Sequence, residues 1–205
     1  MAFLGCSGGS VMRFFLRLRA WQLFVLLMFP LLFSGPAWVH LDSEWVSDLL
    51  ALSVFFIFFA WIYSVGAEFN GLLPEQLGKS LGRFRLAILV ALVSMVLLYV
   101  LDPVKTPSFE ATDPVIPPEI ELGSFLVWGG ALNLIVFVSF IYSIWFAARQ
   151  LETYRRKEPL GFIDYSGAFF LFWFFPLGLW FLQPRINRLC EENRPDQDWT
   201  NAADE

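Results

Sequence analysis

Charged side chains are scarce in this chain, and the residues that most often carry chemistry are scarcer still. Of 205 residues, 14 are basic and 19 acidic, and the chain holds one histidine and two cysteines. His40 stands alone in a short turn between two apolar runs, so we expect no Ser/His, Cys/His or histidine-rich metal site. Cys6 and Cys190 lie at opposite ends of the chain and show no metal-ligand spacing.

Sequence motifs for catalysis are also missing. The chain contains no G-x-x-x-x-G-K-[ST] phosphate loop, no HExxH and no GxSxG. A net charge of -5 argues against a nucleic-acid partner, because phosphate contacts need a basic face. We therefore predict a protein that is not an enzyme and has no cofactor, metal or nucleic-acid partner. The remaining alternative is an enzyme whose catalytic groups are carboxylates alone.

Apolar residues make up 57% of the chain, and 19% of the residues are aromatic. Five stretches, together 104 residues, lack Lys, Arg, Asp and Glu: 20–41, 49–67, 86–101, 122–148 and 165–184. A helix that crosses ~30 Å of hydrocarbon needs roughly 20 mainly apolar residues. The number and length of these stretches predict an all-α membrane protein with several crossings.

The predicted fold is a bundle of five hydrophobic helices. They are expected over about 20–41, 46–67, 84–101, 123–148 and 162–182. Pro176 and Gly178 lie near the middle of the fifth helix, so we expect a kink or break near Pro176. The basic amphipathic residues 149–157 are expected to extend the fourth helix into the interface.

Outside the bundle, the composition predicts irregular segments. We expect a flexible leader over 1–12, a single membrane domain over 13–190, and a disordered acidic tail over 191–205. Residues 102–121 hold five prolines and five acids and predict an extracytoplasmic loop. The first helix could instead be a cleaved signal peptide ending near Ser34-Gly35, but Pro36 and the apolar residues after it favour a retained helix.

The basic residues fix the predicted orientation. With the N-terminus in the cytoplasm, ten basic residues of the first four helices and their loops lie inside and only Lys105 lies outside, as the positive-inside rule requires. A full crossing by the fifth segment would place Arg185, Arg188 and Arg194 outside, whereas a re-entrant segment would keep them inside. Because Phe162–Leu182 spans about 31 Å as a helix, we favour five crossings.

The residues that follow the fifth segment carry a resemblance. The stretch 173–187, which ends in Gln183-Pro184-Arg185-Ile186-Asn187, resembles uncharacterised small inner-membrane proteins of the Bacteroidota that end in an aromatic helix and the same five residues. Trp61-Ile62-Tyr63 and the segment from Leu72 to Phe84 resemble the second helix and loop of that group. The similarity covers roughly 14–190. It implies a bacterial inner membrane and brings no activity.

A few polar residues in or beside the apolar segments are candidate site residues. Asn133 lies within the fourth helix, and Glu68 and Asp164 lie near the cytoplasmic interface, where they could form an intramembrane polar site. Their alternative roles are helix packing for Asn133 and interfacial pairing or capping for the acids. Arg185 and Arg188, with Trp180 and Gln183, suit contacts to lipid phosphates or a partner, the alternative being interface anchoring.

We therefore predict a non-enzymatic, multi-pass protein of a bacterial inner membrane. Its expected partners are the lipid bilayer and another membrane subunit or a second copy of the chain. The alternative is a small transporter or permease subunit in which Asn133 and Glu68 line a polar pathway.

Overall fold

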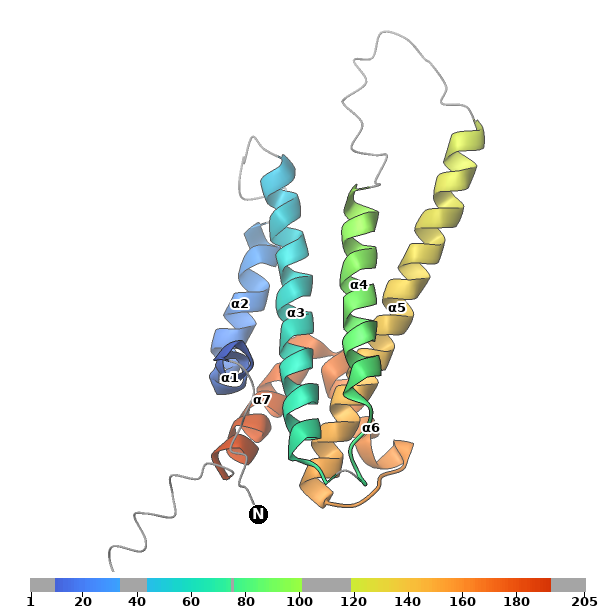
Figure 1. The fold of residues 1–205 in the computed structure, drawn as a ribbon. Coiled ribbons are helices and arrows are strands. Elements are labelled where there is room, and N and C mark those ends of the chain that lie inside the picture. Colours follow the sequence, from blue (N-terminus) through green and yellow to red (C-terminus); the bar gives the residue numbers. More distant parts are fainter. Residues whose placement is uncertain (1–9, 34–43, 75, 101–118, 193–205) are drawn as a thin grey trace, which may run out of the picture.

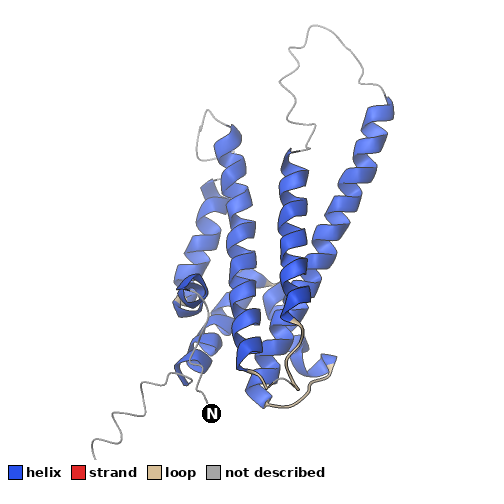
Figure 2. Ribbon diagram, viewed as in Figure 1, coloured by secondary structure: helices blue, strands red, loops and turns tan. Residues whose placement is uncertain are grey.

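The computed structural model describes residues 10–33, 44–74, 76–100 and 119–192, and every regular element among them is a helix (Figure 2). The helices are α1 (Ser10–Arg17), α2 (Ala20–Phe33), α3 (Glu44–Leu72), α4 (Leu81–Val100), α5 (Glu119–Arg156), α6 (Phe162–Trp173) and α7 (Phe175–Glu192). The prediction of an all-α protein is confirmed for the described residues.

Among the described residues, three helices are long and apolar enough to cross a membrane: α3 over Leu49–Leu72, α4 over Leu81–Val100 and α5 over Trp128–Arg156. They stand side by side in Figure 1, with α2 against α3. The pair formed by α6 and α7 would make a fourth span if it crossed as one unit. Five crossings are therefore not confirmed. The predicted helix 20–41 is seen as α2, and its residues 34–41 lie outside the described part.

Several predicted boundaries are wrong. Residues 10–12, expected in a leader, begin α1, which packs against α3 and α7. Residues 119–121, expected in the acidic loop, begin α5, and 191–192, expected in the tail, end α7. The rest of the predicted leader, loop and tail lies outside the described residues. The predicted extension of the fourth helix through 149–156 is confirmed, because α5 continues to Arg156.

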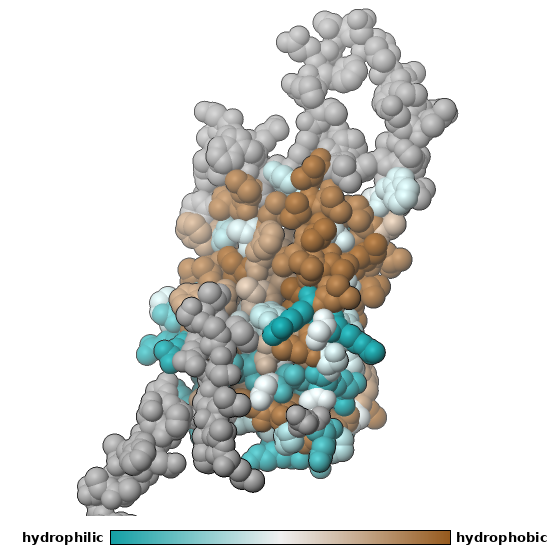
Figure 3. All heavy atoms as spheres, in the orientation of Figure 1, coloured by the Kyte–Doolittle hydropathy of each residue, from teal (hydrophilic) through white to brown (hydrophobic). Residues whose placement is uncertain are grey.

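One end of the bundle, which we call the basic end, is where α3 ends, α4 begins and α5 ends. Hydrophilic residues gather at this lower end in Figure 3, below a broad apolar belt. The buried core also lies toward it: Phe84 of α4 stacks on Phe146 of α5, with ring centroids 4.2 Å apart. Gly66 of α3 leaves room for both rings, since a Cβ there would lie 2.7 Å from Phe84.

The chain reverses between α6 and α7, whose axes differ by 120°. The break is at Phe174, whose ψ of 49° is not helical, two residues before Pro176, near which a kink or break was expected. Pro176 falls in the first turn of α7, where a missing N–H leaves no intrahelical bond unmade. Gly178 allows the reversal, because a Cβ there would overlap the Leu171 carbonyl of α6. The second proline, Pro184, lies inside α7 and does not start a new helix.

Candidate functional site

Two groups of polar side chains connect the helices at the basic end. The first is the Gln183 network, which consists of Gln183, Asn187, Trp61 and the carbonyls of Phe15 and Leu18. Gln183 is fully buried, and its Oε1 accepts the indole N–H of Trp61 at 3.0 Å. Its Nε2 contacts the carbonyls of Phe15 at 3.1 Å and Leu18 at 2.9 Å and the Asn187 Oδ1 at 3.2 Å, so two N–H groups are shared among three acceptors.

The Gln183 network explains the spacing of the Gln-Pro-Arg-Ile-Asn string. Gln183 and Asn187 are four residues apart and share one face of α7. Asn187 also donates to the Leu18 carbonyl, at 3.3 Å. The last carbonyls of a helix lack intrahelical partners, and the two amides supply donors to such groups where α1 ends at Arg17. The network therefore ties α1, α3 and α7 together.

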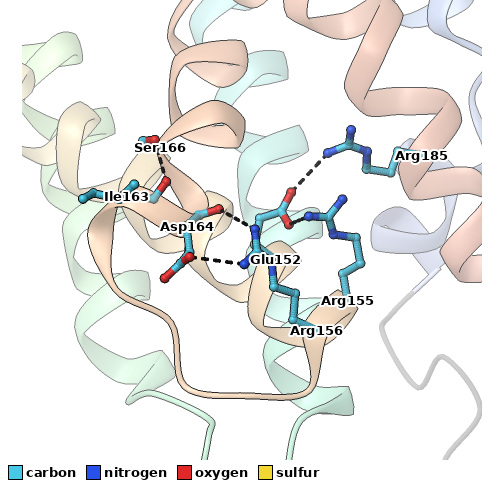
Figure 4. Close-up of polar contacts among 7 residues, drawn as sticks. All are labelled: Glu152, Arg155, Arg156, Ile163, Asp164, Ser166 and Arg185. Carbon is cyan, nitrogen blue, oxygen red and sulfur yellow. Dashed lines mark hydrogen bonds and ion pairs between the residues drawn. The ribbon is translucent and has the colours of Figure 1, made fainter.

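The second group is the Glu152 network, drawn in Figure 4. The Glu152 side chain on α5 is only 4% exposed, and its Oε1 lies 3.1 Å from Nη1 of Arg185 on α7. Its Oε2 lies 2.6 Å from Nη2 of Arg155, three residues further along α5. One buried carboxylate thus holds two half-exposed guanidinium groups. Because Arg155 and Arg185 meet at one acid, α7 returns to the end of the bundle at which α5 finishes.

The Asp164 side chain forms its hydrogen bonds at the start of α6. Its Oδ2 accepts the N–H of Gly161 at 3.0 Å. Its Oδ1 accepts a bond from Arg156 of α5 at 3.2 Å (Figure 4). These are the contacts of a helix N-terminus with an acid in its first turn. The capping alternative for this residue fits the structure.

Glu68 and Asn133 are not brought together. Glu68 is buried near the basic end of α3, where its neighbour Phe69 packs against Tyr154 of α5. Asn133 lies 21 residues before Tyr154 along α5, about 31 Å at the helical rise. Its Nδ2 donates to the Gly129 carbonyl, at 2.9 Å, on its own helix. The two residues predicted to line one polar pathway are thus far apart.

The predicted lipid or partner contacts divide into two pairs. Trp180 and Arg188 are exposed on α7 and stay candidates. Gln183 is wrong as a surface contact, because it is fully buried and bonded within the protein. Arg185 is engaged by Glu152. For these two residues the structure favours a role in packing.

Sequence reasoning missed Glu152 and Trp61. Glu152 is the only acid among the basic residues of 149–157, and an isolated acid within a basic stretch was the signal available for it. Trp61 was noted only as part of the resemblance, and nothing in the sequence marks its indole as a buried hydrogen-bond donor among nine tryptophans. In the described part of the chain, no group of three or more His, Cys, Asp or Glu residues could hold a metal ion.

No family model matches the chain, and no curated protein or solved structure is similar to it. The function must be inferred from the arrangement itself.

Proposed function

We propose that this protein is a non-enzymatic, multi-pass component of a bacterial inner membrane that binds another membrane subunit through α4 and α5. The proposal rests on one observation, the lack of a core in the far halves of these two helices. We define the far half of α5 as Trp128–Val138 and that of α4 as Met95–Val100.

No residue is buried in either far half. On α5 the exposed large apolar side chains are Trp128, Leu134, Ile135, Phe137 and Val138, and on α4 they are Val96, Leu97 and Val100. A peripheral membrane helix normally exposes one face to lipid and buries another. Here even the side chains between the two helices stay partly exposed, which supports a further helix packing there.

Asn133 adds a polar group to this surface. Its amide is exposed on an apolar helix, where a polar side chain is costly in hydrocarbon. Asparagine side chains stabilise contacts between membrane helices by hydrogen bonds worth about 0.6–2 kcal/mol. A partner helix against the far half of α5 would cover both the apolar side chains and this amide.

The positions of the basic residues support a cytoplasmic location for the basic end. Lys79, Arg83, Arg149 and Arg155 lie at the basic end, and Arg185 joins them through Glu152. Cytoplasmic segments are enriched in such residues. The contact between Arg185 and Glu152 favours a re-entrant α6–α7 pair, with the end of α7 inside together with the N-terminus.

Site-specific photo-crosslinking in native membranes tests the proposal. A benzoylphenylalanine at Phe137 should give one stoichiometric adduct, and the mass of the adduct separates a second copy from a different subunit. The matched control is the same replacement at Phe181, exposed on α7, which should give none. In an Asn133→Leu background the Phe137 adduct should weaken severalfold. No adduct at Phe137, or equal adducts at both positions, would count against subunit binding through this surface.

A further inference from the structure

A third polar group at the basic end takes no part in the networks above. Trp145 of α5 is flanked by two cations: the Lys79 Nζ lies 4.7 Å from its ring centroid, and the Arg149 guanidinium carbon lies 5.9 Å from it. The indole N–H donates to the Tyr165 hydroxyl at 2.7 Å, which fixes the ring. Two positive groups are therefore held within reach of one rigid aromatic side chain.

The start of α4 adds further positive charge beside Lys79. The first turn of α4 contains no acid, and Arg83 and Arg85 follow within it and just beyond. A helix N-terminus carries partial positive charge and favours anions, so basic residues at this position are unfavourable by themselves. Arg85 donates to the Tyr63 hydroxyl, a neutral partner. An anion bound between the start of α4 and α5 would relieve this accumulation of positive charge.

Buried polar atoms without a hydrogen-bond partner lie on the same part of α5 and are a second, independent indication of a ligand. The Arg149 Nη1, the Thr153 Oγ1 and both amide atoms of Gln150 are buried without a hydrogen-bond partner. Gln150 is 1% and Thr153 2% exposed. A buried donor or acceptor left unpaired costs about 1–3 kcal/mol, so such a group calls for a partner.

Helix geometry turns these atoms toward the start of α4. Gln150 lies one turn beyond Phe146, which stacks on Phe84 of α4. Thr153 lies one turn beyond Arg149, whose neighbour Trp145 lies under Lys79. The face of α5 that carries the unpaired atoms is therefore the face covered by α4 and the segment before it.

We propose that this cluster, formed by Lys79, Trp145, Arg149, Gln150 and Thr153, binds the phosphate of an anionic phospholipid from the inner leaflet. Trp145 lies three residues before the last uncharged residue of its run, at the level where aromatic rings meet headgroups. Basic pockets between membrane helices on the cytoplasmic side suit such headgroups. The phosphate accepts from the cations and Thr153, and the hydroxyls of a glycerol headgroup donate to the Gln150 Oε1. This site is separate from the subunit surface on the far halves.

The test measures how the purified full chain retains phosphatidylglycerol. After delipidation and reconstitution with mixed phosphatidylglycerol and phosphatidylcholine, native mass spectrometry should show one retained phosphatidylglycerol per chain. The Lys79→Gln, Arg149→Gln double variant should bind it about thirtyfold more weakly, because each basic residue near the surface contributes about a fivefold factor. Lys79→Gln alone changes an exposed side chain and should weaken retention about fivefold.

Arg17→Gln is the matched control, since it removes an exposed positive charge on α1, outside the cluster. It should retain the lipid like the unaltered chain. Equal loss in Arg17→Gln and Lys79→Gln, or no preference for phosphatidylglycerol over phosphatidylcholine, would overturn the proposal. Displacement of the lipid by millimolar inorganic phosphate would also overturn it, because the site would then serve a free phosphate.

Discussion

The basic end and the far halves of α4 and α5 both contain large apolar and aromatic side chains, but these side chains pack differently. At the basic end, aromatic rings stack closely, as Phe84 does on Phe146, and the Gln183 and Glu152 networks join distant segments. Over Trp128–Val138 no side chain is buried, and the single amide, Asn133, bonds to its own helix. The comparison teaches that the helices of one end pack against each other within the chain, whereas the other end has surface to offer a partner.

The largest expected effect comes from closing the space at Gly178. Gly178→Ala places a Cβ on the Leu171 carbonyl, so α6 and α7 must separate. We expect a loss of about 3 kcal/mol or more in the free energy of unfolding, at the upper end for overpacking. Gly167→Ala on α6 is the control, because a Cβ there meets nothing within 4 Å. Reversible unfolding in mixed micelles measures both; similar values for the two variants would contradict the tight reversal.

The next largest difference in stability is expected between replacing the amide side chain of Gln183, at the basic end, and that of Asn133, in the far half of α5. Gln183→Leu removes the partner of the Trp61 N–H and of the Phe15 carbonyl, and we expect a loss of about 2–3 kcal/mol. Asn133→Leu removes one exposed amide and should change the stability of the isolated chain by less than about 0.5 kcal/mol. The same micelle unfolding assay applies. A larger cost at Asn133 than at Gln183 would reverse the comparison.

Removing the buried charge of Glu152 should have a middling effect. Glu152→Gln keeps the shape but leaves Arg155 and Arg185 without their carboxylate, and both can turn partly to water because they are half exposed. We expect a loss of about 1–2 kcal/mol. Glu158→Gln, at an exposed acid just after α5, should be close to neutral. Limited proteolysis gives a second readout. Cleavage after Arg185 is expected only in the Glu152 variant, in which α7 should detach from α5.

The smallest effect is expected from a methyl group at Gly66. In Gly66→Ala the Cβ presses on the Phe84 ring, which cannot swing away because it is stacked on Tyr63 and Phe146. The strain should exceed the gain of about 1 kcal/mol from helix propensity and leave a net loss of about 1 kcal/mol. Gly130→Ala in the far half of α5 meets nothing within 4 Å and should not destabilise. Thermal melting of both variants side by side is the measurement.

The sequence predicts the apolar stretches that form α3, α4 and α5, because a candidate span needs only length and hydropathy. The long α5 could be anticipated from the amphipathic stretch 149–157 that follows an uncharged run. The α6–α7 reversal was anticipated only as a kink or break near Pro176 and as the re-entrant alternative. A length of about 31 Å over Phe162–Leu182 suggested one crossing, since length cannot reveal a break. Pro176 drew attention to the right region, but the break falls at Phe174, where no special residue stands.

The candidate site was harder to predict than the spans. Gln183 and Asn187 stood out as polar residues beside an apolar run, but their acceptors belong to α1 and Leu18, more than 160 residues earlier in the chain. A residue such as Glu152 becomes informative only when Arg185 is placed against it. The charge count of thirteen basic residues against one for a re-entrant segment agrees with that contact, although segment length favoured the other choice.

The unbroken length of α5 has a mechanical consequence. Its 38 residues form one rod of about 57 Å, roughly twice the thickness of the hydrocarbon layer. Among the described residues of α5, buried side chains begin at Ser139. A tilt of about 10° around that point would carry the first residue of α5, about 30 Å away, through about 5 Å. A partner that displaces the first half of α5 would therefore also tilt its last turns, where Glu152 and Arg155 meet Arg185 of α7.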